Sequence, residues 1–352
     1  MNEVIEKILN FAVYAPSGDN CQPWEFIYDN QNLHVLNLPD ADNPIFNFKQ
    51  RGSFIAHGAL IENIKQISPL FGYSAKENLF PNNQNPNLIA TISFTPITPQ
   101  ENNNLLNIIR KRSTNRKSYL RDPLKAVEKE KLINTSNEDS LGTMLFIEEG
   151  EKKGNLGKAA SVAEMVMLQY QPLHQAFFSL VCWDPKEIKR GMPVDTLELP
   201  GPKKIIFSWF SNWKNSKILR MIGMPSIIAK ENSQIYSSSA AIGAIVQTEN
   251  NPSNFVKTGM LLQKIWLTAT ALNLSLQPIA GVLYLDQKLE SEGIPGLPEK
   301  LKLKILNAKN EIYKNFNNPN GHITLIFRIG KGDPPSATSP KLSPKITYTN
   351  NP

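Results

Sequence analysis

A weak internal repeat constrains the fold of this chain more than any other feature. The segment GALIENIKQISPLFGYS begins at Gly58, and GMLLQKIWLTATALNLS begins at Gly259. Aligned without gaps, the two share four identical positions, which are Gly58 with Gly259, Leu60 with Leu261, Ile64 with Ile265 and Ser74 with Ser275. Each copy predicts an amphipathic helix that is followed later by a strand. Either the chain consists of two related α+β halves, or two amphipathic helices share a pattern by chance.

The composition is that of an ordinary globular protein. Of the 352 residues, 41% are hydrophobic and 20% are charged, and the formal net charge is +7. Basic residues form no long run, so the charge predicts a diffuse cationic surface that attracts anions such as a phosphorylated cofactor. It does not by itself indicate a nucleic-acid partner.

Several classes of protein are excluded by what the sequence lacks. The longest apolar runs fall far short of the roughly 20 residues of a membrane-spanning helix, and the N-terminal segment has no signal-peptide core. Cys21 and Cys182 form neither a disulfide framework nor a zinc motif, and the four histidines are widely separated. We therefore expect a cytoplasmic protein with no structural metal.

The hydrophobic periodicity places helices and strands in both halves. The predicted helices cover residues 2–14, 51–71, 101–111, 124–134, 252–273 and part of 297–317, and the predicted strands cover 24–28, 33–38, 88–95, 143–148, 239–248 and 322–329. Residues 184–234 are rich in proline and then in basic and aromatic residues, which indicates an inserted flap. The tail, 333–352, is rich in Pro, Ser and Thr and is predicted to be extended or disordered.

Two short segments have the chemistry of a binding site. APSGDNCQPWEF, at 15–26, is a turn between a helix and a strand that exposes backbone N–H groups and small polar side chains. Such a loop can hydrogen-bond a polar ring edge, although helix–strand turns often have this composition. Arg112-Ser113-Thr114-Asn115-Arg116 places two guanidinium groups four residues apart with hydroxyls between them, which suits a phosphate. A solvated basic loop is the alternative.

Two weaker candidates follow predicted elements of the second half. Arg328-Ile329-Gly330-Lys331-Gly332 comes directly after a strand and also suits an anion. Gln277-Pro278-Ile279-Ala280-Gly281 has small residues that permit close approach to a flat ligand, or it is an ordinary buried turn.

Taken together, these segments resemble the FMN-dependent nitroreductase family. The resemblance covers about residues 5–332 and rests on the loop at 15–24, the RxSxR-type element at 112–116, the helix from Gly259 running into QPIAG, and the terminal RIG. The arginine element follows the loop here, whereas it precedes the loop in the ordinary homodimeric family. This order is similar to that of a single-chain subgroup whose two halves form an internal pseudo-dimer, with residues 190–201 similar to its inserted lid.

The resemblance implies a nitroreductase-like α+β fold with mostly antiparallel sheets. The first half would cover residues 1–100, and the second 101–332 with a lid at about 184–234. It also implies one FMN per chain. The residues implied to hold the cofactor are Arg112, Ser113, Thr114 and Arg116 for phosphate and ribityl chain, Arg328 and Lys331 for phosphate, Pro16, Ser17 and Asn20 for the ring, and Pro278, Ile279, Ala280 and Gly281 for its reactive edge.

Some positions depart from the family pattern. Ala280 stands where an acidic residue near the reactive nitrogen is expected, Thr114 stands where Ser is usual, and Cys21 lies inside the ring-lining loop. We assign no catalytic acid or base, because a flavin carries out hydride transfer with little help from side chains.

Three functions remain open at this point. In the first, the chain is an NAD(P)H-dependent flavoenzyme that reduces a nitroaromatic, quinone or similar planar acceptor. In the second, it stores or sequesters FMN under the lid, with little turnover. In the third, the basic-aromatic segment 203–221 binds a membrane surface or stacks on single-stranded nucleic acid. The resemblance implies a monomer that is an internal pseudo-dimer, and further dimerisation remains open.

Overall fold

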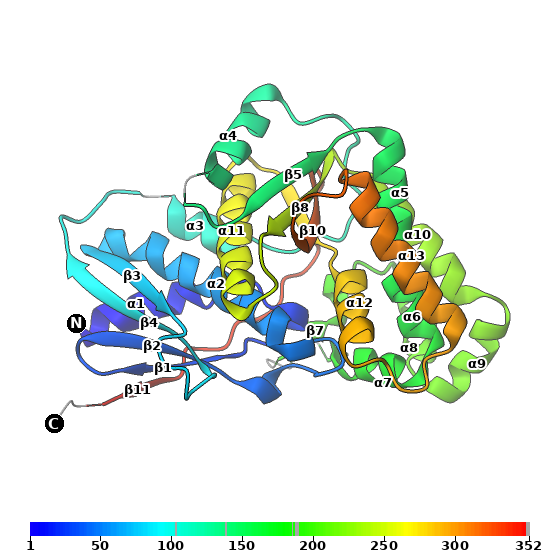
Figure 1. The fold of residues 1–352 in the computed structure, drawn as a ribbon, viewed down its shortest axis with the longest axis horizontal. Helices are drawn as coiled ribbons and strands as arrows, with labels where there is room; N and C mark the ends of the chain where they lie inside the picture. Colours follow the sequence, from blue (N-terminus) through cyan, green and yellow to red (C-terminus); the bar gives the residue numbers. More distant parts are fainter. Residues whose placement is uncertain (103, 138, 185, 187–189, 350–352) are drawn as a thin grey trace.

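The computed structural model describes residues 1–102, 104–137, 139–184, 186 and 190–349, and Figure 1 shows its fold. Two sheets lie apart in the molecule, and a pair of long helices lies between them (Figure 1). The class is α+β, as predicted.

The first sheet is built from the N-terminal hundred residues and one strand of the tail. Its order is β11-β1-β2-β4-β3, in which β1 to β4 pair antiparallel and β11 joins β1 in parallel. The strands are β1 (Trp24–Tyr28), β2 (Asn32–Asn37), β3 (Tyr73–Leu79), β4 (Leu88–Pro96) and β11 (Ile346–Tyr348). Burial alternates along β1 and β2, so one face packs against the core, where helix α1 (Asn2–Ala12) contributes Ile5, Ile8 and Leu9.

The second sheet is formed by strands after residue 142. Its order is β5-β8-β10-β9, with every neighbouring pair antiparallel. The strands are β5 (Thr143–Ile147), β8 (Ala241–Gln247), β9 (Ser275–Pro278) and β10 (His322–Gly330). All residues of β8 are buried, because the sheet is covered on both of its faces.

The two long helices, α2 (Arg51–Ile67) and α11 (Pro252–Ala271), cross at the two glycines of the sequence repeat. A Cβ on Gly58 would lie 1.9 Å from the carbonyl oxygen of Val256, and a Cβ on Gly259 would lie 1.9 Å from that of Ile55. Only glycine permits this approach. Ile55 and Val256 each stand three residues before the repeat glycine of their helix, so the contact is reciprocal, as expected of a two-fold relation.

Helices surround the second sheet and form a second apolar core with it. They are α5 (Gly150–Ala160), α6 (Val162–Gln169), α7 (Gln171–Ser179), α12 (Gly281–Ser291) and α13 (Glu299–Asn315), while α3 (Leu105–Lys111) and α4 (Ala126–Asn137) pack against α11. The sequence analysis did not predict α5, α6, α7, α12 or β3. In α12 the apolar residues follow directly on the glycine of the QPIAG segment, for which the sequence allowed either close approach to a flat ligand or an ordinary buried turn.

The segment predicted as an inserted flap is largely helical. It contains β7 (Met192–Pro193), which pairs with β6 (Val181–Cys182), and the helices α8 (Gly201–Phe210), α9 (Trp213–Met221) and α10 (Met224–Ser237). Of these, α10 packs against α5 and α6, and its Tyr236 joins the second core. The last helix of the segment therefore belongs to the core, which the flap interpretation did not foresee.

Of the two predicted states of the tail, extended or disordered, residues 333–349 have the extended one. The tail runs in extended form from the end of β10 to β1, where Phe26 faces Ile346 in the register of the parallel pair. Tyr348 donates a hydrogen bond from its hydroxyl to the Glu6 carboxylate at 2.8 Å. The composition of the tail indicated weak burial, but residues 345–349 hydrogen-bond to the edge of a sheet that is distant in sequence.

No helix in the described ranges is long and apolar enough to cross a membrane.

Candidate functional site

The arginine motif, residues 112–116, is held in an extended segment between α3 and α4. Thr114 forms an isolated parallel bridge with Leu276, and the Asn115 side-chain amide donates to the Ser275 hydroxyl (2.8 Å) and to the Asp333 carbonyl (2.7 Å). The motif is thus fixed on β9 and on the start of the tail. It does not lead directly into a helix, so no helix N-terminus adds backbone amides to it; the next helix, α4, begins at Ala126.

Arg112 is buried with part of its guanidinium unpaired. The side chain is 7% exposed, its Nη2 donates to the Tyr14 carbonyl at 2.9 Å, and its Cζ lies 4.4 Å from the Trp266 ring centroid. Nε and Nη1 have no hydrogen-bond partner among the described residues. Burial lowers the pKa of Arg112 to about 9. A buried cation with two unused donors is unfavourable unless an anion satisfies it.

Arg116 connects the motif to the inserted segment and to the N-terminal loop. Its Nη1 donates to the Thr196 carbonyl at 3.0 Å, and its Nη2 lies 3.9 Å from the Met192 sulfur. Burial lowers the pKa of Arg116, and the negative charge of Asp19 opposes that shift. Burial in turn raises the pKa of Asp19, against the effect of Arg116. The two predicted site segments therefore lie together in space.

The loop after α1 has an unusual backbone. Asp19, Asn20 and Gln22 all have φ between 46° and 58°, which is the left-handed region. Residues other than glycine avoid this region, and runs of such residues occur mainly where a site needs them. The Ser17 hydroxyl accepts a hydrogen bond from the Gln22 amide at 3.0 Å, which stabilises the turn, and Pro16 is half-buried beside it.

The tail brings a lysine into this loop, and sequence reasoning missed it. Lys341 donates from Nζ to the Ala15 carbonyl (2.9 Å) and to the Asn20 side-chain oxygen (3.3 Å), while the Asn20 side-chain amide donates to the Pro340 carbonyl (3.1 Å). Burial, and then the charge of Arg112, lower the pKa of Lys341 to about 7. No sequence signal pointed to it, because the tail composition predicted no fixed structure.

Arg328 occupies a different position from the one expected. It is fully buried, and its guanidinium donates to the Gln277 side-chain oxygen (2.7 Å) and to three main-chain carbonyls, those of Ile235 (2.9 Å), Asn115 (3.2 Å) and Lys117 (2.7 Å). The guanidinium thus anchors the arginine motif and is not free for the phosphate contact that the resemblance implied. Lys331 is half-exposed and lies 3.4 Å from the Glu128 carboxylate, so its phosphate contact stays a prediction.

The segment 278–281 joins β9 to α12. The Ile279 amide donates to the Ile326 carbonyl at 2.9 Å, so it is not available to a ligand, contrary to expectation. Ala280 is the N-cap residue of α12, and the helix begins at Gly281. The first N–H groups of a helix have no partner within it, so the amides from Gly281 onward retain the ability to bind a polar edge.

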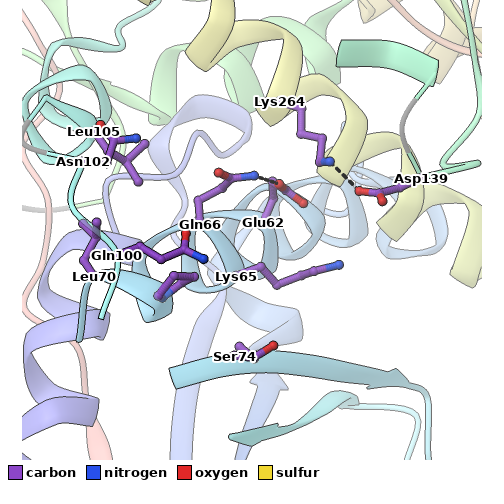
Figure 2. Close-up of a pocket in the computed structure, with 12 residues that line it drawn as sticks. Glu62, Lys65, Gln66, Leu70, Ser74, Gln100, Asn102, Leu105, Asp139 and Lys264 are labelled. Atoms are coloured by element: carbon purple, nitrogen blue, oxygen red, sulfur yellow. Dashed lines mark hydrogen bonds and ion pairs between the residues drawn. The ribbon is translucent and has the colours of Figure 1, made fainter. Parts of the chain in front are cut away.

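A separate cavity of about 350 Å³ opens elsewhere, lined by residues that include Glu62, Lys65, Gln66, Ser74, Asp139 and Lys264 (Figure 2). Through the sequence repeat, Glu62, Lys65 and Ser74 correspond to Gln263, Trp266 and Ser275. Two of those residues, Trp266 and Ser275, contact the arginine motif. The cavity therefore lies where the repeat would place a second copy of the candidate site.

The chemistry of this cavity is different from that of the arginine motif. Lys264 forms an ion pair with Asp139, and Lys65 pairs with Glu77 at 2.9 Å. The Glu62 carboxylate accepts a hydrogen bond from Gln66 at 2.7 Å, and burial raises the pKa of Glu62. Balanced charges and a buried carboxyl do not suit a phosphate.

Several known proteins are similar to this chain in sequence. No family model matches the chain. Over 341 residues, 95% of this chain and 46% of the relative, it is 23% identical to "Uncharacterized protein MT1398" of Mycobacterium tuberculosis. Over 118 residues, 33% of this chain and 34% of the relative, it is 29% identical to "Putative NAD(P)H nitroreductase Rv3131" of the same organism. The chain spans about half or less of the length of these relatives.

Solved structures give weaker similarities. A putative nitroreductase from Anabaena variabilis matches 94% of this chain and 88% of its own with a TM-score of 0.45 and 12% identity. A nitroreductase with bound FMN from Bacteroides fragilis matches 68% of this chain and 95% of its own with a TM-score of 0.38 and 9% identity. TM-scores below 0.5 do not establish a common fold. Over 33% of its length, the chain is similar in sequence to proteins named putative NAD(P)H nitroreductases, the family that its motifs resemble.

Proposed function

We propose that this chain is an FMN-dependent oxidoreductase of nitroreductase type. The observation that carries the proposal is the unpaired Nε and Nη1 of buried Arg112, beside a loop in left-handed conformation. A phosphate monoester offers acceptors that satisfy both donors, and Lys341 adds a second cation that the sequence relationship did not suggest. The relatives named as NAD(P)H nitroreductases support the same class of reaction.

In this proposal each segment has one task. Arg112, Lys341, Ser113 and Thr114 hold the phosphate and ribityl chain, and Arg328 positions the motif from behind. Pro16, Ser17 and Asn20 line the ring, and the amides at the start of α12 bind its polar edge. The flavin, when bound, supplies the two-electron chemistry. The protein orients it and excludes water, and no side chain is assigned a proton transfer.

We further propose that each chain holds one FMN and reduces a planar acceptor, such as a nitroaromatic or a quinone, at the expense of NADH or NADPH. The different chemistry of the cavity at Glu62 supports a single site. The reciprocal crossing at Gly58 and Gly259 supports two related halves within one chain, an internal pseudo-dimer.

The test is spectroscopic. Purified protein is saturated with FMN and mixed anaerobically with excess NADH or NADPH, and the flavin absorbance near 450 nm is followed. We expect prompt bleaching by one nucleotide and re-oxidation by a quinone or nitroaromatic. A protein that takes up no FMN would contradict the whole proposal.

Flavin storage is the second candidate, and one observation favours it. Arg116 donates to the Thr196 carbonyl, so the inserted segment is tied directly to the arginine motif. A segment held there would cover a bound flavin and prevent nicotinamide from stacking on it. FMN that binds but is bleached by neither nucleotide would support storage and contradict the reductase.

A further inference from the structure

The helices α8 to α10 expose an unusual amount of apolar surface. Seven of the fourteen exposed large apolar side chains in the described part of the chain lie within residues 201–237, and they are Ile205, Ile206, Trp209, Ile218, Met221, Ile222 and Ile227. Ile205 and Met221 are 74% and 78% exposed. These helices lie at the edge of the molecule that is opposite the first sheet (Figure 1).

The buried faces of the same helices already pack against other apolar side chains of the protein. Phe210 and Leu219 pack with Phe178 of α7 in a small apolar cluster, and His174 donates a hydrogen bond from Nε2 to the Phe210 carbonyl (3.0 Å). The exposed side chains are therefore a second, outer face and not a core left open. Apolar surface concentrated in this way indicates an interaction site.

Basic residues share this outer face. In α9 and its C-cap residue, one side of the helix, about 140° wide at 100° per residue, carries Lys214, Lys217, Ile218, Met221 and Ile222. Lys214 and Lys217 are exposed, and no carboxylate pairs with either of them among the described residues. Residues 201–237 contain six basic side chains and one acidic one. Lysine beside exposed isoleucine and methionine is the pattern of an interfacial helix, in which the ammonium groups reach the headgroups.

The charge pattern favours a lipid surface over other occupants. Two copies of this face would bring their lysines together, which opposes self-association. Stacking on nucleic acid requires exposed aromatic rings, but Phe210 is buried, and Trp213 packs 5.0 Å from the His174 ring and 3.4 Å from the Arg220 guanidinium. Of the aromatic residues in the segment 203–221, only Trp209 is among the exposed large apolar residues.

We propose that the outer face of α8 to α10 binds the surface of a membrane that contains anionic lipids. The apolar side chains enter the boundary between headgroups and acyl chains, and Lys214 and Lys217 contact lipid phosphates. This binding does not depend on FMN, so it can fail while the proposed enzyme function stands, and the reverse also holds.

The experiment is co-sedimentation of the full chain with vesicles of phosphatidylcholine, with or without phosphatidylglycerol. We expect binding to the anionic vesicles that weakens as salt is added. The double variant Ile218→Asn/Met221→Asn should reduce partitioning roughly tenfold or more, because apolar contact is lost. Lys214→Ala/Lys217→Ala should reduce it roughly fivefold for each lysine at low ionic strength.

Matched controls come from exposed residues on other helices. Leu303→Asn on α13 and Lys131→Ala on α4 should leave partitioning unchanged. Thermal midpoints establish that each variant is folded. Absence of binding to anionic vesicles, or equal loss in the controls, would overturn the proposal. So would sedimentation velocity that shows Ile218→Asn/Met221→Asn converting a dimer to a monomer, because the face would then be a self-association surface.

Discussion

At the scale of the residue, the two arginines of one motif have different environments. Arg112 is buried with two unused donors, whereas Arg116 donates to the inserted segment and faces Asp19. Arg328 has its donors bound to main-chain carbonyls and to Gln277. The charge of an arginine is therefore a poor guide to its role, and its unsatisfied hydrogen-bonding capacity is a better one.

Substitution of Arg112 tests the phosphate contact. Arg112→Gln should weaken FMN binding roughly 10- to 100-fold, the range for loss of a hydrogen bond to a charged group. Riboflavin, which has no phosphate, should bind equally to both proteins. Titration by flavin fluorescence quenching measures both affinities. Arg110→Gln is the control, because Arg110 is exposed and stacks on Phe11. Equal losses for FMN and riboflavin would contradict a phosphate role.

If Lys341 contacts the phosphate as proposed, FMN binding should depend on pH. Its pKa in the free protein is about 7, below the ordinary value of 10.5, so the ammonium is lost as the pH rises through 7. A bound phosphate favours the charged form, and FMN affinity should therefore fall above pH 7, by up to about tenfold per pH unit. Lys341→Met should remove this dependence and bind FMN weakly throughout. Lys345→Met, at an exposed lysine of the same tail, should keep the wild-type profile. A flat wild-type profile between pH 7 and 9 would exclude the contact.

At the scale of the element, the crossing of α2 and α11 is a packing contact that leaves no space for an added side-chain atom. Each glycine of the pair lets a main-chain carbonyl of the other helix approach to a distance that a Cβ would prevent. The helices also connect the two halves through Gln263, which donates to the Asn63 side-chain oxygen at 2.7 Å. A change at the crossing therefore acts on both halves together.

Alanine at Gly259 should destabilise the protein by about 3 kcal/mol or more, since a methyl group has no space beside the Ile55 carbonyl. The matched control is Gly154→Ala in α5, where nothing lies within 4 Å of the added Cβ. There alanine should stabilise by about 0.5–1 kcal/mol through helix propensity. Urea unfolding measures both changes. If both substitutions changed the free energy of unfolding in the same direction, the crossing would be looser than described.

At the scale of the whole molecule, the candidate site needs distant parts of the chain. Contacts of the loop that follows α1 bring together the motif at 112–116, about 100 residues away, and Lys341 of the tail. The tail crosses from the second sheet to the first, and β11 extends the first sheet. Neither half alone contains every contact of the site.

One FMN per chain is the expected stoichiometry for this arrangement. Saturating FMN should give a flavin-to-chain ratio of about one by absorbance and by native mass spectrometry, and Arg112→Gln should lower the occupancy of that single site at limiting FMN. The cavity at Glu62 should bind no FMN, because its carboxyl groups oppose phosphate. Two flavins per chain, one of them retained in Arg112→Gln, would contradict the single-site arrangement.

The sequence by itself determined the long helices, six of the strands and the segments of the candidate site. Periodicity located the long helices and most strands, the repeat identified Gly58 and Gly259, and local composition identified the loop and the arginine motif. These are local properties, since turn residues, apolar spacing and charge act over a few positions.

Only the tertiary structure decided which hydrogen-bond donors already have partners and which remain available to a ligand. It assigned Arg328 to main-chain carbonyls, used the Ile279 amide in the second sheet, placed Lys341 beside the loop and exposed the outer face of α8 to α10. The physical reason is that burial and hydrogen-bond satisfaction depend on neighbours hundreds of residues away. Composition, which indicated an extended or disordered tail, contains no information about those neighbours.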